Sequence, residues 1–205
     1  MNASTTTFLL IRHGMTDAVG RVMMGRSPGV HLNAAGRAQA ERLAERLRDV
    51  RFTAIVSSPL ERTRDTAAAI AAPHGLAVEP VDGLLEYEVG EWTGSAFRDL
   101  DRDPGWRRFN GVRSITRPPG GELMIDVQQR AVTALLDLRE RHPSGTIAAV
   151  SHGDVIRAIL LFVLGMPIDF LHRLEVSPGT VSVVTFGPAE PRLLSMNGDS
   201  VPAVA

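Results

Sequence analysis

Short apolar runs alternate along the chain with longer stretches in which apolar residues recur every three or four positions. The short runs are rich in β-branched residues and lack strict alternation, which is typical of strands buried on both faces. They predict strands at residues 8–11, 54–57, 146–150 and 181–186. The longer stretches predict helices at residues 34–49, 60–72, 122–141 and 154–164.

Residues typical of helix ends support these boundaries. Asn33 is a suitable N-cap for the first helix, Pro73 and Pro143 follow the second and third, and Gly165 can end the fourth. Strands that alternate with helices indicate an α/β fold. We expect a three-layer α/β/α sandwich in which helices cover both faces of a mostly parallel central sheet.

Two segments depart from this alternation. Residues 95–121 interrupt it, and we interpret them as an insertion or cap. The segment after residue 187 contains Pro and Gly, and we expect a partly disordered tail there. With no repeat and no low-complexity linker, one domain over residues 1–205, with a core at about 8–186, is the economical interpretation.

The composition excludes several classes of enzyme. The chain has no Cys and no Lys, so all 22 basic residues are Arg. Disulfides, thiolate nucleophiles and Cys-ligated metal clusters are therefore excluded. Schiff-base chemistry and a Walker-A phosphate loop are also excluded, because both require Lys.

The charge balance bears on partners and on location. A net charge of −1 argues against broad nucleic-acid binding and against a membrane-surface role. No apolar stretch approaches the ~20 residues of a membrane span. The first residues lack the charged and apolar regions of a signal peptide. We therefore expect a cytoplasmic protein without nucleic-acid or membrane partners.

Basic residues follow three of the predicted strands. Arg12, His13 and Gly14 end the first strand, Arg62 and Arg64 open the helix after the second, and His152 and Gly153 follow the third. The carboxyl ends of strands in an open α/β sheet form the ligand site. An Arg in the first turn of a helix opposes the helix dipole unless an anion binds there. The pattern predicts an anion site at this edge of the sheet.

Four segments in order carry a family resemblance. They are Arg12-His13-Gly14, Ser57-Ser58-Pro59-Leu60-x-Arg62-x-x-x-Thr66-Ala67, Glu86-x-x-x-Gly90-x-Trp92-x-Gly94 and Ser151-His152-Gly153. Together they resemble the histidine phosphatase (phosphoglycerate-mutase-like) superfamily over about residues 8–186. Residues 28–32 and 151–156 are most similar to an actinobacterial branch of phosphomutase and phosphatase proteins.

The resemblance implies roles for individual residues. His13 would be the nucleophile that becomes phosphohistidine, and Arg12, Arg62 and His152 would clamp the phosphate. Glu86 would protonate the leaving group and then activate water, with Glu88 as the competing carboxylate.

The resemblance also extends to residues around the phosphate. It adds Gly153 and Thr16 to the phosphate site, and the segment from Arg21 to Arg26 resembles one that closes over substrate. Arg21 or Arg26 is therefore expected to line the entrance, with a simple surface role as the alternative. Val19 stands where the family often has Asn, so a phosphate contact is lost or comes from another residue such as Thr16.

The remaining histidines have no motif partners, and we expect surface or structural roles for His31, His74, His142 and His172. Zinc-binding motifs such as H-E-x-x-H are absent from the sequence, and we expect no metal and no cofactor.

The implied function is a metal-independent phosphatase that hydrolyses a small-molecule phosphate monoester. The alternatives are a cofactor-dependent phosphoglycerate-type mutase and a non-catalytic module that binds phosphorylated ligands. The compact segment after the Glu86 motif favours the phosphatase over the mutase. The arginines and aromatic residues of segment 95–121 would form either a lid that selects an acidic or ring-bearing leaving group or a solvated cap. The sequence does not determine the oligomeric state, and a homodimer is one alternative.

Overall fold

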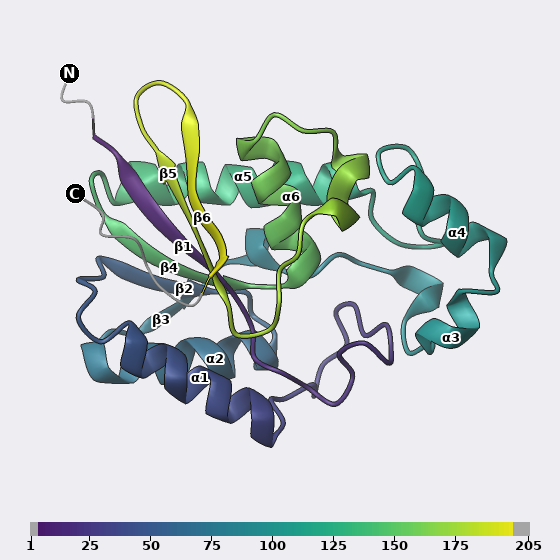
Figure 1. Cartoon of the computed structure of the whole chain (residues 1–205), viewed down its shortest axis with the longest axis horizontal. Coiled ribbons are helices and arrows are strands. Elements are labelled where there is room, and N and C mark those ends of the chain that lie inside the picture. The colour runs from purple at the N-terminus through teal and green to yellow at the C-terminus, as the bar shows by residue number, and fades with distance from the viewer. Residues whose placement is uncertain (1–3, 199–205) are drawn as a thin grey trace.

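The central sheet determines where the site lies. The computed structural model describes residues 4–198, and within that range six strands form one sheet in the order β3-β2-β4-β1-β5-β6 (Figure 1). The strands are β1 (Thr6–Arg12), β2 (Ala54–Ser57), β3 (Val78–Pro80), β4 (Thr146–Ser151), β5 (Val181–Phe186) and β6 (Pro191–Gly198). Strands β3, β2, β4 and β1 are parallel, whereas β5 and β6 add to the sheet as antiparallel strands. The expected α/β class is confirmed.

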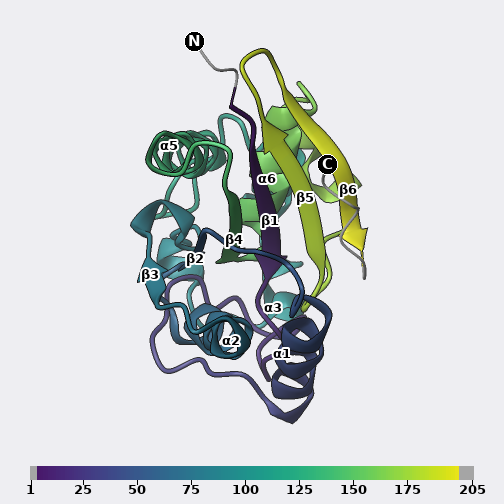
Figure 2. The ribbon, with the colours of Figure 1, turned by 90° about the vertical axis from the view of Figure 1, so that its left-hand side faces the viewer.

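Helices cover both faces of the sheet (Figures 1 and 2). The α-helices are α1 (Ala34–Arg46), α2 (Glu61–Ala71), α3 (Phe97–Leu100), α4 (Pro104–Gly111), α5 (Met124–Arg141) and α6 (Gly153–Val163). Short 3₁₀ turns are η1 (Ala72–His74), η2 (Asp82–Leu84), η3 (Gly90–Trp92) and η4 (Ile168–Arg173). Helices α1 and α2 lie on one face, and α5 and α6 lie on the other.

Strand β1 contributes to both hydrophobic cores because successive side chains of a strand point to opposite faces. Phe8 and Leu10 pack in the core that includes residues of α5 and α6. Leu9 and Ile11 pack in the core that includes residues of α1 and α2. All four side chains are at most 1% exposed. This double burial explains the continuous apolar run that predicted the strand.

The predicted helices all form, with small differences at their ends. Asn33 is the N-cap of α1, since its side-chain oxygen accepts a hydrogen bond from the Gly36 amide at 2.9 Å. Helix α1 ends at Arg46, three residues before the predicted end at Asp49, because residues 47–49 leave the helix as turns. Helix α6 ends before Gly165, whose φ of 63° suits a left-handed residue after a helix.

The pattern of apolar residues did not predict two of the strands, β3 and β6. Strand β3 has three residues and ends in Pro80, so it lacks a recognisable apolar run. Strand β6 pairs with β5 and alternates between half-buried and exposed positions over most of its length. The expectation of a partly disordered tail after residue 187 is therefore wrong as far as residue 198, because residues 191–198 pair with β5 as a strand. Residues 199–205 lie outside the described range.

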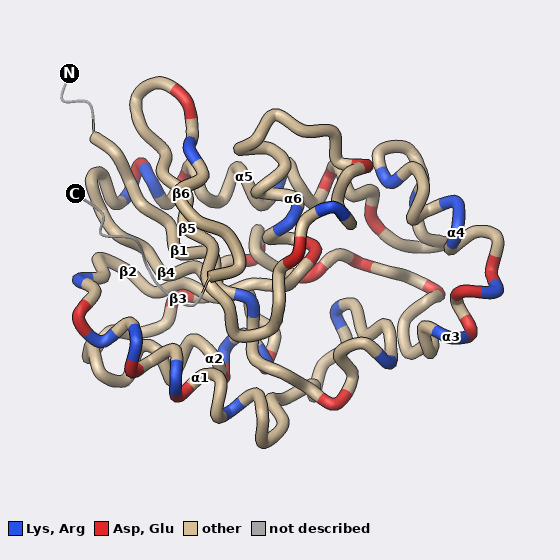
Figure 3. Tube along the Cα trace, viewed as in Figure 1, with Lys and Arg blue, Asp and Glu red and all other residues tan. Residues whose placement is uncertain are grey.

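Segment 95–121 forms a cap beyond the end of the sheet, built on α3 and α4 (Figure 1). Trp106 and Phe109 are buried, and both contact the ring of Trp92 with centroid distances of 5.3 and 5.4 Å. Acidic and basic residues are both present along the cap (Figure 3). The aromatic contacts attach the cap to the core through the segment that carries Glu86.

None of the helices in the described range combines the length and apolar character needed to cross a membrane.

Candidate active site

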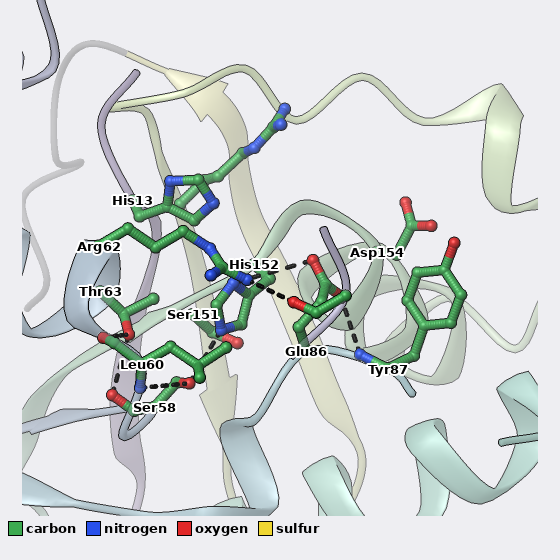
Figure 4. Close-up of polar contacts among 12 residues, drawn as sticks. His13, Ser58, Leu60, Arg62, Thr63, Glu86, Tyr87, Ser151, His152 and Asp154 are labelled. Atoms are coloured by element: carbon green, nitrogen blue, oxygen red, sulfur yellow. Dashed lines mark hydrogen bonds and ion pairs between the residues drawn. The ribbon is translucent and has the colours of Figure 1, made fainter. Parts of the chain in front are cut away.

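The predicted site residues meet at the carboxyl ends of the parallel strands. His13 follows β1, Arg62 lies in the first turn of α2, and His152 is the N-cap of α6, directly after β4. Glu86 comes from the loop after η2. Figure 4 shows these four side chains around a common space. Three of them, His13, Arg62 and Glu86, line one pocket of about 250 Å³ together with Arg12, Thr16 and Gly153, whereas His152 is not part of this lining.

His13 is held in the form that a nucleophile needs. Its Nδ1 lies 2.8 Å from the carbonyl oxygen of Gly14. Since a carbonyl oxygen can only accept, Nδ1 carries the proton and Nε2 keeps its lone pair. Burial and then the charge of Arg62 lower the pKa of His13 to about 3, so the ring is neutral near pH 7. A neutral imidazole with a free Nε2 can attack phosphorus.

Two guanidinium groups lie beside His13 with donors to spare. Arg12 donates from Nη1 to the Val176 carbonyl at 2.7 Å, and Arg62 donates from Nη2 to the Gly25 carbonyl at 2.8 Å. Within the described part of the chain, Nε of Arg12 and Nη1 of Arg62 are buried and have no hydrogen-bond partner. Buried donors of this kind are costly unless a ligand satisfies them. Phosphate oxygens are suitable acceptors for Nε of Arg12 and Nη1 of Arg62.

Gly153 allows Arg12 to lie against the start of α6. A Cβ atom at Gly153 would lie 3.2 Å from Nε and Cζ of Arg12. The first amides of α6 therefore lie close to the same guanidinium, and a helix N-terminus is itself favourable for an anion. Gly153 belongs to the pocket lining as expected, because it brings Arg12 and the helix N-terminus together.

His152 is positioned by Ser58, a residue whose role the sequence analysis did not assign. Its Nε2 lies 2.8 Å from the Ser58 hydroxyl oxygen, and both residues are fully buried. The Ser58 oxygen also accepts weakly from the Leu60 amide at 3.5 Å. Nδ1 of His152 faces Glu86 at 3.8 Å and has no hydrogen-bond partner in the described part of the chain. Burial lowers the pKa of His152 well below its ordinary value, so the ring is a neutral donor.

Glu86 is a carboxyl group that holds a proton at unusually high pH. Burial, and next the negative charge of Asp154, raise its pKa to about 7, against the opposing effect of Arg62. Its Oε1 accepts a hydrogen bond from the Tyr87 amide at 3.0 Å. A carboxyl group with this pKa can both donate and accept a proton near neutrality. The competing Glu88 accepts from the Gly90 amide and lies outside the pocket lining.

An ion-pair cluster supports the backbone of Glu86. Arg26 and Arg130 both donate to the Glu86 carbonyl oxygen, at 2.7 and 3.2 Å. The same two guanidinium groups pair with Glu122, at 2.7 and 3.1 Å. The expectation that Arg26 lines the entrance is therefore wrong. Its guanidinium binds Glu122 and the Glu86 carbonyl oxygen, and Arg26 is not part of the pocket lining. Arg26 acts on the site through the position of Glu86.

Two other arginines also lie away from the pocket. Arg21 is exposed and is not in the lining, although neighbouring residues such as Gly20 and Val22 are. The expectation that Arg21 lines the entrance is wrong, because its side chain extends into solvent. Arg64 is likewise exposed, and only Arg62 of the pair in α2 reaches the site.

Thr16 and Val19 both line the pocket. Thr16 is 3% exposed and can present a hydroxyl group where Val19 offers none. Gly14 is needed for the packing of α1. A Cβ atom there would lie 2.6 Å from the carbonyl oxygen of Gly36, so Gly14 lets α1 pack against the loop that carries His13.

The far wall of the pocket was not predicted as a site. It is formed by Tyr87, Arg113, Asp154, Arg157 and His172. Arg113 lies in the cap, and its Nη2 is 2.9 Å from Nε2 of His172. The assignment of His172 to a surface or structural role therefore needs correction, since it lines the pocket. Asp154 directly follows the His152-Gly153 motif, which is the one local signal that could have indicated this wall.

Within residues 4–198, no group of three or more His, Asp or Glu side chains is arranged to hold a metal ion.

A comparison with protein families identifies the family of this chain. A family model described as the histidine phosphatase superfamily (branch 1) matches residues 8–199. The chain belongs to this superfamily. The resemblance carried by the four sequence motifs is confirmed, and the superfamily includes phosphatases and mutases.

Two relatives with similar sequences come from different bacteria. The chain is 35% identical to Uncharacterized protein Rv0525 of Mycobacterium tuberculosis over 163 residues, covering 76% of this chain and 77% of that protein. It is 32% identical to the Probable phosphoglycerate mutase GpmB of Salmonella choleraesuis over 181 residues, covering 86% and 83%.

Solved structures agree with this family. The α-ribazole phosphatase of Shigella flexneri has a TM-score of 0.86 and 28% identity, with 97% of this chain and 100% of that chain covered. A mycobacterial glucosyl-3-phosphoglycerate phosphatase has a TM-score of 0.84 and 27% identity, with 96% and 100% covered.

Proposed function

We propose that this chain is a metal-independent phosphatase that hydrolyses a small-molecule phosphate monoester through a phosphohistidine intermediate. The observation that carries the proposal is the pairing of His13 with Glu86 around one pocket. The first is neutral with a free Nε2, and the second is a carboxyl group with a pKa of about 7. One supplies a nucleophile and the other supplies a proton, both near neutral pH.

The first step transfers the phosphoryl group to His13. The lone pair of Nε2 forms a bond to phosphorus while the bond to the ester oxygen breaks. Protonated Glu86 gives its proton to the departing oxygen, so an alcohol leaves. Arg12, Arg62 and His152 donate to the three other phosphoryl oxygens as charge develops on them. Because these donors are already in place, little reorganisation is needed during the step.

The second step releases phosphate. Glu86 is now a carboxylate and takes a proton from water, whose oxygen bonds to phosphorus. The bond from phosphorus to Nε2 breaks, and its electron pair returns to the ring. His13 and Glu86 then regain their starting protonation states. Glu86 thus acts as an acid in the first step and as a base in the second, while His13 is first the nucleophile and then the leaving group.

The alternative function is a phosphoglycerate-type mutase. Similarity to the Probable phosphoglycerate mutase GpmB favours it. Similarity to solved phosphatases favours hydrolysis, as does the compact cap of segment 95–121. A mutase would return the phosphoryl group to a second hydroxyl group, whereas a phosphatase gives it to water.

The test is phosphate release from a panel of phosphorylated metabolites and p-nitrophenyl phosphate, with EDTA present. We expect turnover with EDTA, and mass spectrometry of the acid-labile adduct should place one phosphoryl group on His13. His13→Ala should abolish both signals. His31→Ala is the matched control, because His31 is an exposed histidine paired with Asp65, and it should retain activity. Interconversion of phosphoglycerates after bisphosphate priming, without phosphate release, would indicate the mutase.

A further inference from the structure

Two arginines of the far wall share a single carboxylate. Nη1 of Arg113 lies 2.9 Å from one oxygen of Asp154, and Nη1 of Arg157 lies 2.8 Å from the other. Arg113 comes from the cap, whereas Asp154 and Arg157 come from α6. None of the catalytic steps described above uses these three groups. Their charges therefore need a separate explanation.

The charges around the pocket do not balance. Its lining contains four arginines, of which Arg12 and Arg62 are assigned to phosphate, and two carboxyl groups, Glu86 and Asp154. A phosphoryl dianion offsets the first two arginines, and Asp154 offsets one of the other two. Because Glu86 is protonated when the leaving group departs, one positive charge remains at the far wall.

Neighbouring groups do not remove this charge. Glu175 is 3.8 Å from Arg157, but its side chain is 69% exposed and its charge is screened by water. Burial, and next the charge of Arg113, lower the pKa of His172, so its ring stays neutral near pH 7. An unbalanced buried charge is unfavourable until an opposite charge reaches it.

Arg113 also retains an unsatisfied donor. The residue is 1% exposed, and its guanidinium lies 4.5 Å from the centre of the Phe109 ring. Its Nη2 donates to Asn110 at 2.7 Å, whereas its Nε is buried and has no hydrogen-bond partner in the described part of the chain. A planar guanidinium in this state is suited to an oxyanion.

Apolar residues also line the pocket. Met23, Phe97 and Trp106 contribute to the lining, and its volume is about 250 Å³. That space suits a short carbon chain or one small ring between the phosphate and the far wall. A single additional negative charge corresponds to a carboxylate, because a second phosphate dianion would exceed the one remaining positive charge.

We propose that Arg113 determines specificity by binding a carboxylate on the leaving group, so that the preferred substrates are small phosphate monoesters of hydroxy acids. This inference rests on the proposed phosphatase function and adds the class of leaving group. Arg157 and Asp154 hold Arg113 in place from α6. In this proposal the cap supplies Arg113, which binds the leaving group, and the edge of the sheet supplies the catalytic residues.

The experiment compares two matched substrate pairs. The first pair is 4-carboxyphenyl phosphate and 4-carbamoylphenyl phosphate, which differ in charge but little in size. The second pair is 3-phosphoglycerate and glycerol 3-phosphate. For the wild-type protein we expect kcat/KM to favour the carboxylate of each pair by about tenfold or more, as charge-assisted hydrogen bonds are strong.

Variants of the cap assign this preference to one residue. Arg113→Gln should bring the ratio within each pair close to one, and Arg113→Lys should keep part of the preference. Arg98→Gln is the matched control, since the Arg98 side chain is 86% exposed on the same cap, and its ratio should equal that of the wild type. Thermal unfolding of each variant reports whether the cap remains folded, and if Arg113→Gln does not fold, Arg113→Lys and the wild-type ratios decide.

The outcomes separate this inference from the proposed function. Equal kcat/KM values within both pairs for the wild type would overturn the role of Arg113, and so would a ratio that survives in folded Arg113→Gln. If 4-carbamoylphenyl phosphate is hydrolysed through phosphorylated His13 in those cases, the phosphatase function stands. Failure of all four substrates, with no phosphoryl group on His13, would instead contradict the proposed function.

Discussion

The protonation of Glu86 follows from where its carboxyl group lies. It is buried beside Asp154, and both effects favour the neutral form and raise its pKa to about 7. His13 and His152 are shifted in the opposite direction, because burial and nearby arginines disfavour an added positive charge. The same low-dielectric pocket therefore keeps a carboxyl group protonated and two imidazoles neutral. These are the states that the first chemical step requires.

The pH dependence of kcat/KM should follow the protonation of Glu86. We expect kcat/KM for an alkyl phosphate to fall as pH rises through about 7, where Glu86 loses the proton that the leaving group needs. Glu86→Gln should lower this kcat/KM by roughly 10²–10⁴-fold. The loss should be much smaller for p-nitrophenyl phosphate, whose leaving group is stable without a proton. Steady-state kinetics between pH 5 and pH 9 measure both, and equal losses for the two esters would contradict the acid role.

Glu86→Gln should lower activity but raise stability at alkaline pH. The folded-state pKa of Glu86 is raised, so its contribution to stability is present below the ordinary carboxyl pKa and is lost as pH rises through about 7. At pH 8, Glu86→Gln should therefore raise the free energy of unfolding, by on the order of 2 kcal/mol. Near pH 4.5 the two proteins should be about equally stable. Glu91→Gln, which changes an exposed carboxylate nearby, is the control for denaturant unfolding at both pH values.

At the scale of elements, the start of α1 and the loop after β1 are packed without room for a methyl group. A Cβ atom at Gly36 would lie 2.1 Å from the Met15 carbonyl oxygen. The loop that this contact holds begins at His13. Helix α1 is thus more than a cover for the sheet, because its first turn fixes the backbone that carries the nucleophile.

Gly36→Ala should reverse the usual effect of replacing glycine in a helix. Ala normally stabilises a helix interior by about 1 kcal/mol relative to Gly. Here the close contact with Met15 should destabilise the protein and displace the His13 loop, with loss of phosphatase activity. Gly111→Ala is the matched control, since nothing lies within 4 Å of a Cβ at that position of α4, and it should be neutral or slightly stabilising. Thermal unfolding and activity of both variants test this, and a stabilised, active Gly36→Ala would contradict it.

Local signals explain how far the sequence predicts these elements. Buried parallel strands leave apolar runs, and their ends bring Arg12, Arg62 and His152 together by topology alone. Strand β6 mixes apolar and polar residues and is only half-buried, so it has no continuous apolar run, and only its pairing with β5 identifies it as a strand. Ser58 and Arg113 were not assigned to the site because their roles depend on partners far away in sequence, at His152 and Asp154.

At the scale of the whole molecule, several contacts join the cap to the core, and two of them lie at α4 and directly after it. Aromatic packing links α4 to Trp92, near the Glu86 loop. Beyond α4, both the amide and the hydroxyl group of Ser114 donate to Asp169 of η4, at 2.7 and 2.9 Å. The second link lies next to Arg113, so it fixes how closely the far wall approaches the phosphate site.

Asp169→Ala should loosen the cap while the sheet edge stays intact. Both Ser114 hydrogen bonds are lost, so we expect faster amide hydrogen exchange over residues 104–114 and a severalfold rise in KM. Asp169→Asn keeps one acceptor oxygen, so its exchange rate and its KM should lie between those of the wild type and Asp169→Ala. Asp99→Ala is the control, because its ion pair with Arg98 lies on the exposed surface of the cap and exposed pairs contribute little. Unchanged exchange in Asp169→Ala would mean that the remaining contacts, among them the aromatic packing and the Arg113–Asp154 ion pair, hold the cap without the Asp169 hydrogen bonds.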